Sequence, residues 1–357
     1  MTVTVFGGYG VFGGHVSRAL AEAGVPVRIA GRDGEQARRA AAGLGMGASG
    51  VAADLRDPAS CARALAGTRV AVCCAGPFSS LPPVLPEACL AAGVHYVDIA
   101  DDRGWSARLR ALGPRFHDRG LTAACGCSSL PGISGALALL AAERLTVDFL
   151  PAVERARITL YIGNCNPKGE AAVHAAASQL GRRFLAPQGP LIGLRGRETV
   201  DLPAPFGPRT VLDFDSPELD LFPALLGARS VRVKVGFESR LATTAMAALS
   251  FLGPRLGTAA ARAVAPLARL LSRSGHSGGT VKAELWSLDG TAASASLSGA
   301  EEGQRMAALP AAFVAQALWD PENTIPRGTV TAWEALTPRG LLDRLTASGY
   351  QLEAMSS

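Results

Sequence analysis

The stretch Thr2-Val3-Thr4-Val5-Phe6-Gly7-Gly8-Tyr9-Gly10-Val11-Phe12-Gly13-Gly14 decides the fold. Its apolar, β-branched beginning is typical of a buried parallel strand. The pattern G-x-G-x-x-G follows directly, from Gly8 to Gly13, and apolar residues at helical spacing continue to Gly24. A strand, a glycine turn and a helix in this order predict a cradle whose helix N-terminus holds the pyrophosphate of a dinucleotide.

Each glycine of the pattern is expected to have a separate structural role. Gly8 permits the tight turn out of the strand, Gly10 lets the backbone approach a phosphate without a Cβ, and Gly13 lets the helix lie close on the sheet. The alternative is a glycine-rich turn that binds nothing. We expect contacts to the cofactor from Gly8, Tyr9, Gly10, Val11, Phe12 and Gly13.

The end of the second predicted strand, Val27 to Ala30, distinguishes the two nicotinamide cofactors. Enzymes that use NAD generally place a carboxylate there for the ribose 2′-hydroxyl, whereas a 2′-phosphate requires a guanidinium. Gly31 and then Arg32 stand at this position, which favours NADP(H). The preference reverses if the carboxylate of Asp33, rather than Arg32, faces the ribose.

Loops at the ends of later strands complete the predicted site. Asp54 follows a third strand and can accept from the adenine amine, although Asp57-Pro58 just after it is a good helix start and makes a capping role the alternative. The small-residue loop after a fourth strand lies where the nicotinamide half of the cofactor passes. The further expected contacts are Asp54, Leu55, Ala75, Gly76, Pro77, Phe78 and Ser128.

Strands and helices alternate along the first part of the chain, which predicts a doubly wound parallel sheet. Beyond residue 150 the pattern changes. Segments 155–162 and 231–236 alternate polar with apolar residues, and 281–288 pairs with 292–297 across Asp289-Gly290, a type I′ hairpin signal. The predicted fold class is α/β, with an N-terminal Rossmann domain and a second α+β domain built on an antiparallel sheet.

We expect the NADP(H)-binding Rossmann domain in residues 1–140, the substrate domain in 141–305, and C-terminal helices in 306–357 that return to the first domain. The last helix is predicted to start at Thr337-Pro338, with Thr as N-cap. The least polar later segment, 241–271, contains Pro254 and several arginines. It is too charged to span a membrane and is expected to be an apolar surface or core.

Composition limits the classes of function. Hydrophobic residues make up 48% of the 357 residues and charged ones 18%, which indicates a compact globular protein. The formal charge is +5, but the arginines are scattered, which disfavours nucleic-acid binding. The seven cysteines are odd in number, and several lie in apolar runs, which favours reduced, buried thiols over a zinc or redox site. No signal peptide precedes the first strand, so we expect a cytoplasmic protein.

Five segments together resemble the saccharopine dehydrogenase-like NADP-dependent oxidoreductases. They are Gly7-Gly8-Tyr9-Gly10-Val11-Phe12-Gly13, Ala30-Gly31-Arg32-Asp33, Ala75-Gly76-Pro77-Phe78, His95-Tyr96-Val97-Asp98 and Gly126-Cys127-Ser128-Ser129-Leu130-Pro131-Gly132. The resemblance is specific across residues 1–135 and looser beyond. It implies a Rossmann domain that binds NADP(H), an inserted substrate domain, and hydride transfer.

The family includes enzymes that act on C=N bonds of amino-acid and polyamine condensation products, and also enoyl reductases of lipid assembly, so the resemblance leaves the acceptor open. The second domain is conspicuously apolar, which argues against a substrate with several carboxylates. We therefore expect an NADPH-dependent reductase of biosynthesis that delivers hydride to a C=N or C=C bond of a small, fairly apolar intermediate. A homodimer stays open.

Two alternatives are weighed against this expectation. A short-chain dehydrogenase is disfavoured because none of the lysines, Lys168, Lys234 and Lys282, follows a tyrosine by four residues, so the Tyr-x-x-x-Lys pair is absent. A catalytically silent NADP-binding sensor or scaffold protein would bind the cofactor without oxidising it.

Hydride addition leaves a negative charge, or an amine, that needs a proton. The candidate donors are Lys168 and His174, in a polar loop and helix that follow the first strand of the second domain. The competing interpretation is a solvated loop cation and a helix-face histidine. His95 precedes a strand and is expected to be structural.

Overall fold

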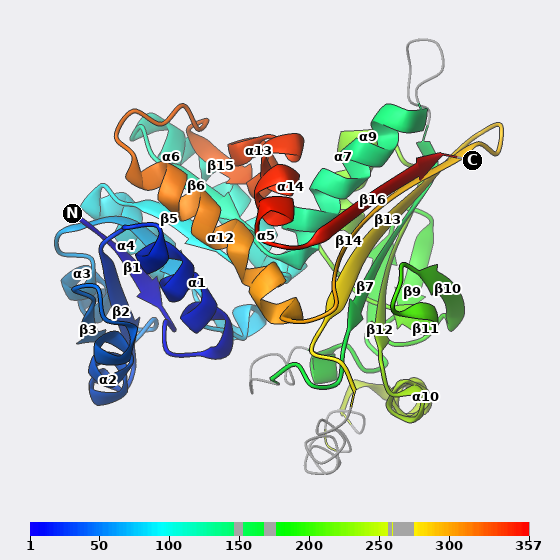
Figure 1. The fold of residues 1–357 in the computed structure, drawn as a ribbon, viewed down its shortest axis with the longest axis horizontal. Coiled ribbons are helices and arrows are strands. Elements are labelled where there is room, and N and C mark those ends of the chain that lie inside the picture. Colours follow the sequence, from blue (N-terminus) through cyan, green and yellow to red (C-terminus); the bar gives the residue numbers. More distant parts are fainter. Residues whose placement is uncertain (146–152, 168–175, 256–258, 260–274, 357) are drawn as a thin grey trace. The chain divides into compact units, whose positions relative to one another are not determined.

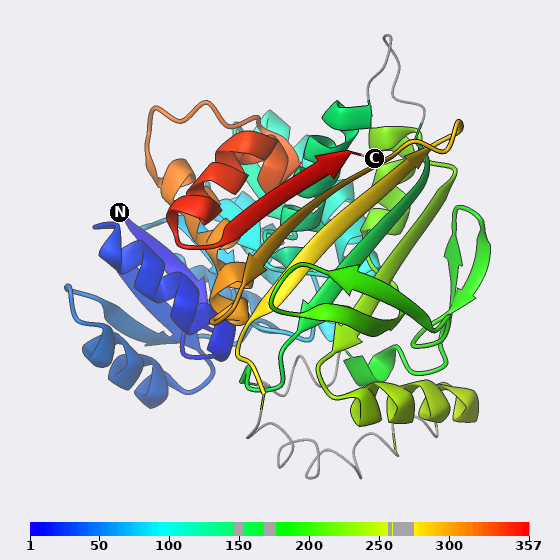
Figure 2. The same ribbon diagram turned by 45° about the vertical axis from the view of Figure 1, so that its right-hand side comes forward.

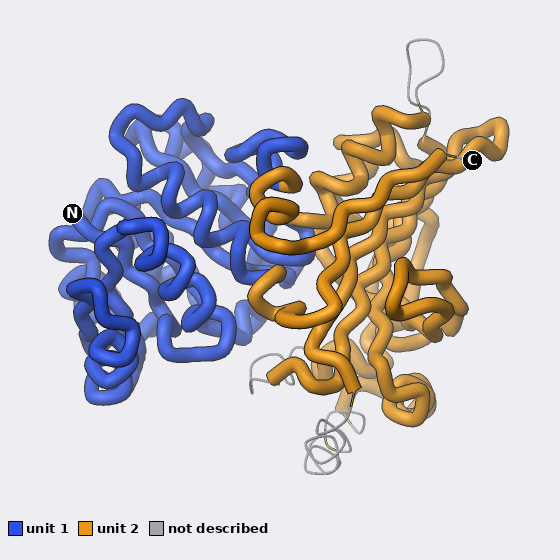
Figure 3. Tube along the Cα trace, in the orientation of Figure 1, with its two compact units in different colours: residues 1–132, 307–341 blue, residues 133–306, 342–357 orange. Residues whose placement is uncertain are grey.

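The computed structural model describes residues 1–145, 153–167, 176–255, 259 and 275–356, and the chain forms two compact units. Unit 1 comprises Met1–Gly132 and Ala307–Leu341, and unit 2 comprises Ile133–Met306 and Leu342–Ser357 (Figure 3). The expected third segment, 306–357, is therefore divided between the two units.

Unit 1 is built on a seven-stranded parallel sheet with the order β15-β6-β5-β4-β1-β2-β3 (Figure 1). Its first six strands follow the Rossmann order, which reverses between β1 and β4. The strands are β1 Thr2–Phe6, β2 Val27–Gly31, β3 Ser49–Ala52, β4 Thr68–Cys73, β5 His95–Asp98, β6 Thr122–Cys125 and β15 Gly328–Thr331. The predicted doubly wound sheet is confirmed, and β15 adds an edge strand from late in the chain.

Helices connect these strands, and acidic caps fix where several of them start. Asp33 accepts from the backbone N–H of Gln36 (3.0 Å), and Asp102 accepts from that of Trp105 (2.7 Å). Residues 103–118 form two helices, because Pro114 has no N–H with which to continue the first. The helices are α1 Val11–Glu22, α2 Gly34–Leu44, α3 Pro58–Ala64, α4 Val84–Ala92, α5 Arg103–Ala111, α6 Gly113–Asp118, α12 Gly303–Trp319, α13 Ala332–Leu336 and α14 Pro338–Ala347.

Unit 2 is built on a second seven-stranded sheet, with the order β10-β11-β12-β7-β13-β14-β16, beside a separate β8-β9 ribbon. Its strands are β7 Val153–Ile162, β8 Arg183–Ala186, β9 Gly189–Ile192, β10 Glu198–Leu202, β11 Gly207–Asp213, β12 Ser230–Phe237, β13 Gly279–Ser287, β14 Ala292–Gly299 and β16 Gln351–Ser356. The pair of β7 and β12 is parallel, whereas the other pairs of this sheet are antiparallel. The sheet is thus mixed and not wholly antiparallel as predicted. The prediction was wrong on this point because alternation of polar and apolar residues indicates which face of a strand is covered and not the direction of its neighbour.

The hairpin of β13 and β14 forms where it was predicted, but its turn is not type I′. A type I′ turn needs positive φ at both central residues. Of the pair Asp289-Gly290, only Gly290 has it (φ 90°). The carboxylate of Asp289 instead accepts from the backbone N–H of Thr291 (2.9 Å), which closes a longer loop.

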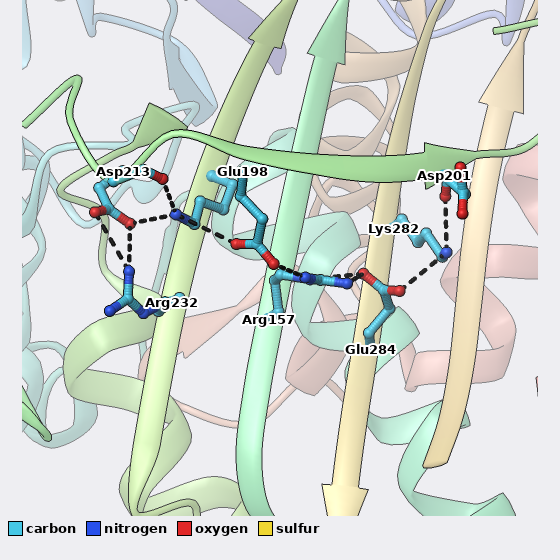
Figure 4. A network of polar contacts seen from close by, with 9 residues as sticks. Arg157, Glu198, Asp201, Asp213, Arg232, Lys282 and Glu284 are labelled. Atoms are coloured by element: carbon cyan, nitrogen blue, oxygen red, sulfur yellow. Dashed lines mark hydrogen bonds and ion pairs between the residues drawn. The ribbon is translucent and has the colours of Figure 1, made fainter. Parts of the chain in front are cut away.

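The two faces of the unit 2 sheet differ. Valines, leucines and alanines of β12, β7, β13 and β14 make one face, and α7 (Ser134–Leu145) packs on it. Charged side chains lie on the other face, which the β10 strand crosses (Figure 2). Nζ of Lys282 on this face donates to the carbonyl of Asp201 on β10 (2.9 Å) (Figure 4). The expected apolar character of the second domain is therefore true of one face only. The remaining described helices are α9 Glu218–Leu226 and α10 Arg240–Leu249.

These charged side chains form a continuous chain of ion pairs that alternates in sign (Figure 4). In order across the sheet they are Arg232, Asp213, Lys234, Glu198, Arg157, Glu284 and Lys282. Lys234 is the most deeply placed of them, with 1% of its side chain exposed. Its ammonium contacts Asp213 (2.8 Å), Glu198 (3.4 Å) and the carbonyl of Gly196 (2.6 Å).

Across the described residues, no helix is both long enough and apolar enough to cross a bilayer. The predicted start of α14 is confirmed, since the hydroxyl of Thr337 accepts from the backbone N–H of Gly340 (3.1 Å). The chain end is not helical: β16 pairs antiparallel with β14, which places it in unit 2.

Replacing Lys234 by methionine is expected to lower the free energy of unfolding by about 3 kcal/mol or more, because it removes one partner of a buried ion-pair cluster. Arg229→Met is the control, since Arg229 makes an exposed pair with Glu154 (3.7 Å) and should change stability by less than about 1 kcal/mol. Urea unfolding measures both. Equal losses in the two variants would show that burial of Lys234 is energetically unimportant.

Candidate dinucleotide site

The loop between β1 and α1 is shaped by glycines that have no room for a side chain. Gly7, not the expected Gly8, takes the left-handed conformation of the turn (φ 75°). A Cβ on Gly8 would lie 2.8 Å from the carbonyl oxygen of Val5 and 3.0 Å from the side chain of Ile29. A Cβ on Gly13 would overlap the carbonyl of Gly7, so the first turn of α1 packs directly on the loop.

The N-terminus of α1 is open to an anion. Gly10 is its N-cap, no side chain caps it, and its first turn contains no carboxylate. Backbone N–H groups at such an end lack helical partners and attract negative charge. Within the described structure, a Cβ on Gly10 would meet only the oxygen of Gly7 (3.1 Å) before extending into open space. Free donors beside that space fit a pyrophosphate.

The end of β2 is closed to a carboxylate by an aromatic ring. Tyr9 lies against Gly31, where a Cβ would overlap the ring and come within 2.7 Å of its hydroxyl oxygen. That oxygen accepts from the backbone N–H of Asp33 (3.3 Å), while the carboxylate of Asp33 caps α2. Arg32 is exposed, and within the described residues its guanidinium makes no hydrogen bond or ion pair. The free charge at this strand end is therefore a cation.

The loops after β3 and β4 lie beside this end of the sheet. The carboxylate of Asp54 accepts from the backbone N–H of Arg56 (2.9 Å), and Asp57 caps α3. Asp54 is exposed, and one of its oxygens makes this bond. Ala75 touches the glycine loop, since a Cβ on Gly7 would lie 3.0 Å from its Cβ. The predicted adenine and nicotinamide loops thus follow β3 and β4, which are separated in the sheet by β1 and β2.

A buried carboxylate ties together the loops after β5 and β6. One oxygen of Asp98 accepts from the backbone N–H groups of Gly126 (2.8 Å) and Ala100 (3.1 Å). The other accepts from the indole N–H of Trp105 (2.6 Å), whose ring packs on Phe78 with centroids 5.5 Å apart. Burial raises the pKa of Asp98, and these donors oppose the shift. Sequence reasoning had named Asp98 only within the family resemblance.

Two half-buried residues, Ser128 and Asp101, lie in these loops. Ser128, half-buried, follows the left-handed Gly126, and its backbone N–H donates to the carbonyl of Gly126 (2.8 Å). Asp101 follows β5 and is half-buried. Burial raises the pKa of Asp101 to about 6, and the charge of Asp102 adds to the shift. Sequence reasoning missed Asp101, for which a run of carboxylates just beyond a strand end was the available signal.

The other expected residues have simpler outcomes. Lys168 and His174 lie outside the described residues. His95 is buried and accepts from the backbone N–H of Thr122 (3.1 Å), and burial lowers its pKa to about 4, which suits the structural role expected of it. All seven cysteines are unpaired thiols. No His, Cys, Asp and Glu side chains in the described part of the chain are grouped to hold a metal.

Known proteins share this architecture. The NmrA-like family model matches residues 1–101. Saccharopine dehydrogenase (L-Glu forming) from Saccharomyces cerevisiae is 12% identical, with a TM-score of 0.64 over 100% of this chain and 99% of its own. The chain is thus saccharopine dehydrogenase-like in fold, and the resemblance expected from its motifs is confirmed.

Other matches cover about a third of this chain. Sorbitol-6-phosphate 2-dehydrogenase SrlD from Erwinia amylovora is 18% identical over 34% of this chain and 69% of its own, with a TM-score of 0.29. A metagenomic short-chain oxidoreductase in complex with NADP is 19% identical over 35% of this chain and 79% of its own, also with a TM-score of 0.29. No curated protein matches the sequence.

Asp101 should make stability depend on pH. Its pKa rises from 3.8 to about 6 on folding, so its contribution is fully present below pH 3.8 and is lost as the pH rises through about 6. The Asp101→Asn variant has no carboxyl group at this position, so its stability lacks this pH-dependent contribution. The difference in unfolding free energy between wild type and variant should therefore fall between pH 4 and pH 6, as measured by urea unfolding. The exposed Asp118→Asn is the control, and parallel curves for Asp101→Asn would refute the raised pKa.

Proposed function

We propose that this protein is an NADPH-dependent reductase that transfers hydride to a C=N or C=C bond of a small, fairly apolar biosynthetic intermediate in the cytoplasm. The observation that supports it most is the uncapped N-terminus of α1 behind a glycine loop that excludes side chains, in a sheet of Rossmann order. The full-length likeness in fold to a saccharopine dehydrogenase supports an oxidoreductase over a protein that only binds the dinucleotide.

The preference for NADP(H) rests on the end of β2. A carboxylate at position 31 would have to displace the ring of Tyr9. The nearest carboxylate, Asp33, is engaged as a helix cap, which argues against the alternative that it faces the ribose. Arg32 is left as the free charge, and a guanidinium binds a phosphate through paired, charge-assisted hydrogen bonds.

When bound, the cofactor supplies the hydride. The chain's own residues then have separate tasks in the proposal: the first N–H groups of α1 bind the pyrophosphate, Arg32 binds the 2′-phosphate, and Asp54 accepts from the adenine amine. Ala75 to Phe78 form a wall beside the nicotinamide half, and Ser128 orients the acceptor. Asp98 touches neither cofactor nor substrate and positions these loops.

The proton that completes reduction needs a donor. Lys168 and His174 stay proposed donors. Asp101 joins them, because an acid with a pKa of about 6 can release a proton near neutral pH.

The proposed acceptor is fairly apolar because several cations on the unit 2 sheet are already paired. Arg157 contacts Glu198 and Glu284, and Lys282 contacts Glu284 (3.0 Å). Recruiting them for the carboxylates of a saccharopine-type substrate would break a partly buried cluster, which is costly.

NADPH is expected to bind at least tenfold more tightly than NADH, a difference of about 1.4 kcal/mol. Arg32→Asp should shrink or invert this ratio. Arg39→Asp makes the same change of charge at another exposed arginine, on α2, and should leave the ratio unchanged. Quenching of tryptophan fluorescence gives the dissociation constants. Equal affinity of the wild type for both cofactors would refute the assignment to NADP.

Gly10→Val should abolish binding of NADPH while the protein stays folded, because its side chain would extend into the proposed phosphate site rather than into the core. Gly14→Val is the matched control, since a Cβ on Gly14, in the same helix, has no described atom within 4 Å. It should bind as the wild type does. If Gly10→Val retains both its melting temperature and its affinity for NADPH, the loop is only a structural turn and the proposed cofactor site is wrong.

A further inference from the structure

Helix α10 has its amphipathic pattern reversed. It packs on β11 and β12 of the unit 2 sheet and continues into the short helix η3 (Ser250–Leu252). Surface helices normally turn an apolar stripe inward and polar residues outward. Here three of the exposed side chains are large and apolar, namely Leu241 (72% exposed), Phe251 (71%) and Leu252 (51%).

The inward side of this segment uses small and polar residues. Thr243 and Ser250 are buried, with 1% and 0% exposed. Their hydroxyls donate locally, that of Thr243 to the carbonyl of Ser239 (3.1 Å) and that of Ser250 to the carbonyl of Ala247 (2.6 Å). These bonds satisfy the buried hydroxyls, and the larger apolar side chains of Met246 and Leu249 are half-buried.

The outward side forms one stripe. Leu241, Ala245, Ala248 and Leu252 recur at intervals of four, three and four residues, which is the spacing of a single helical face, and all are exposed. Phe251 adds its ring at the end of the stripe, where the guanidinium of Arg195 lies 4.0 Å from the ring centroid. Contiguous exposed apolar surface of this kind marks an interaction site.

The charged side chains within this segment have one sign. Residues 239–255 contain two arginines and no aspartate or glutamate. Arg240 and Arg255 are exposed at the two ends, and Arg195 lies at the rim. An apolar stripe with cations at its borders is typical of helices that lie in the interface of an anionic bilayer, with the apolar side chains among the acyl chains and the cations at the headgroups.

We infer that α10 and η3 form a membrane-surface site, through which this protein binds reversibly to bilayers that contain anionic phospholipid. The exposed side chains of Leu241, Phe251 and Leu252 enter the bilayer interface, and Arg240 and Arg255 contact the lipid phosphates. The protein lies on the membrane and does not span it. An anionic bilayer fits better than a second copy of this chain, because two such stripes facing each other would bring arginines together.

The experiment measures co-sedimentation of the full-length protein with vesicles, without cofactor, so that the result is independent of the proposed reductase activity. One set of vesicles contains phosphatidylcholine and phosphatidylglycerol in equal parts, and the other contains phosphatidylcholine alone. The wild type should bind the anionic vesicles at least about tenfold more strongly, and added salt should reduce the difference.

Two variants separate the apolar and ionic contributions. Leu241→Ser, Phe251→Ser and Leu252→Ser combined should weaken binding to anionic vesicles about tenfold or more. Arg240→Gln with Arg255→Gln should mainly reduce the preference for anionic vesicles. The control is Leu185→Ser with Leu288→Ser, which removes leucines that are 68% and 65% exposed on other elements and should bind as the wild type does.

Three results would overturn the inference. The wild type could fail to bind anionic vesicles, the triple serine variant could bind them as well as the wild type, or the control could lose binding equally. A wild-type dimer that becomes a monomer in the triple variant, with no vesicle binding by either, would assign the stripe to an interface between copies. Because the substituted side chains are exposed, the triple serine variant should unfold at the same temperature as the wild type. If it does not, the variant with Arg240→Gln and Arg255→Gln gives a second test.

Discussion

The candidate site depends on the absence of one atom, the Cβ at position 13. The first turn of α1 rests on the carbonyl of Gly7, and any side chain at Gly13 would overlap it. This close packing sets the helix axis against the end of β1, which aims the free N–H groups of the helix at the loop. Gly7 also packs closely against Ala75, and this second contact fixes the distance between the glycine loop and the loop after β4. The cradle and the neighbouring loop are therefore built as one piece.

Asp98 performs the corresponding task one strand further along. A carboxylate without contact to water is costly unless its oxygens are hydrogen-bonded. Asp98 has donors from Gly126, Ala100 and Trp105, and their bonds join the ends of β5 and β6 to α5. These hydrogen bonds offset the cost of burying the carboxylate, and they fix the loops after β5 and β6 and the start of α5 relative to one another.

Sequence patterns predicted the Rossmann sheet because each of its signals is local: the glycine spacing, the apolar runs and the acidic caps all act within a few residues. They failed for the direction of β7 and β12, because alternation records which face is covered and is silent about the partner. The steric role of Gly31 was also invisible, since it depends on Tyr9, more than twenty positions earlier. Asp54 and Asp57 illustrate an intermediate case: Asp57 caps α3, while binding by Asp54 stays a prediction.

The hydropathy of the sequence is least informative about unit 2, because it does not show which surfaces of that unit are polar and which are apolar. The average over this region is apolar, yet the structure places a chain of ion pairs on one face of the sheet and large apolar side chains on the solvent side of α10. A domain that needed stability alone would do the opposite, because burying Leu241 and Phe251 and exposing Lys234 would lower the free energy of the folded state on both counts. The polar interior and apolar exterior of these elements therefore favour a function for the outer surface over a role in folding.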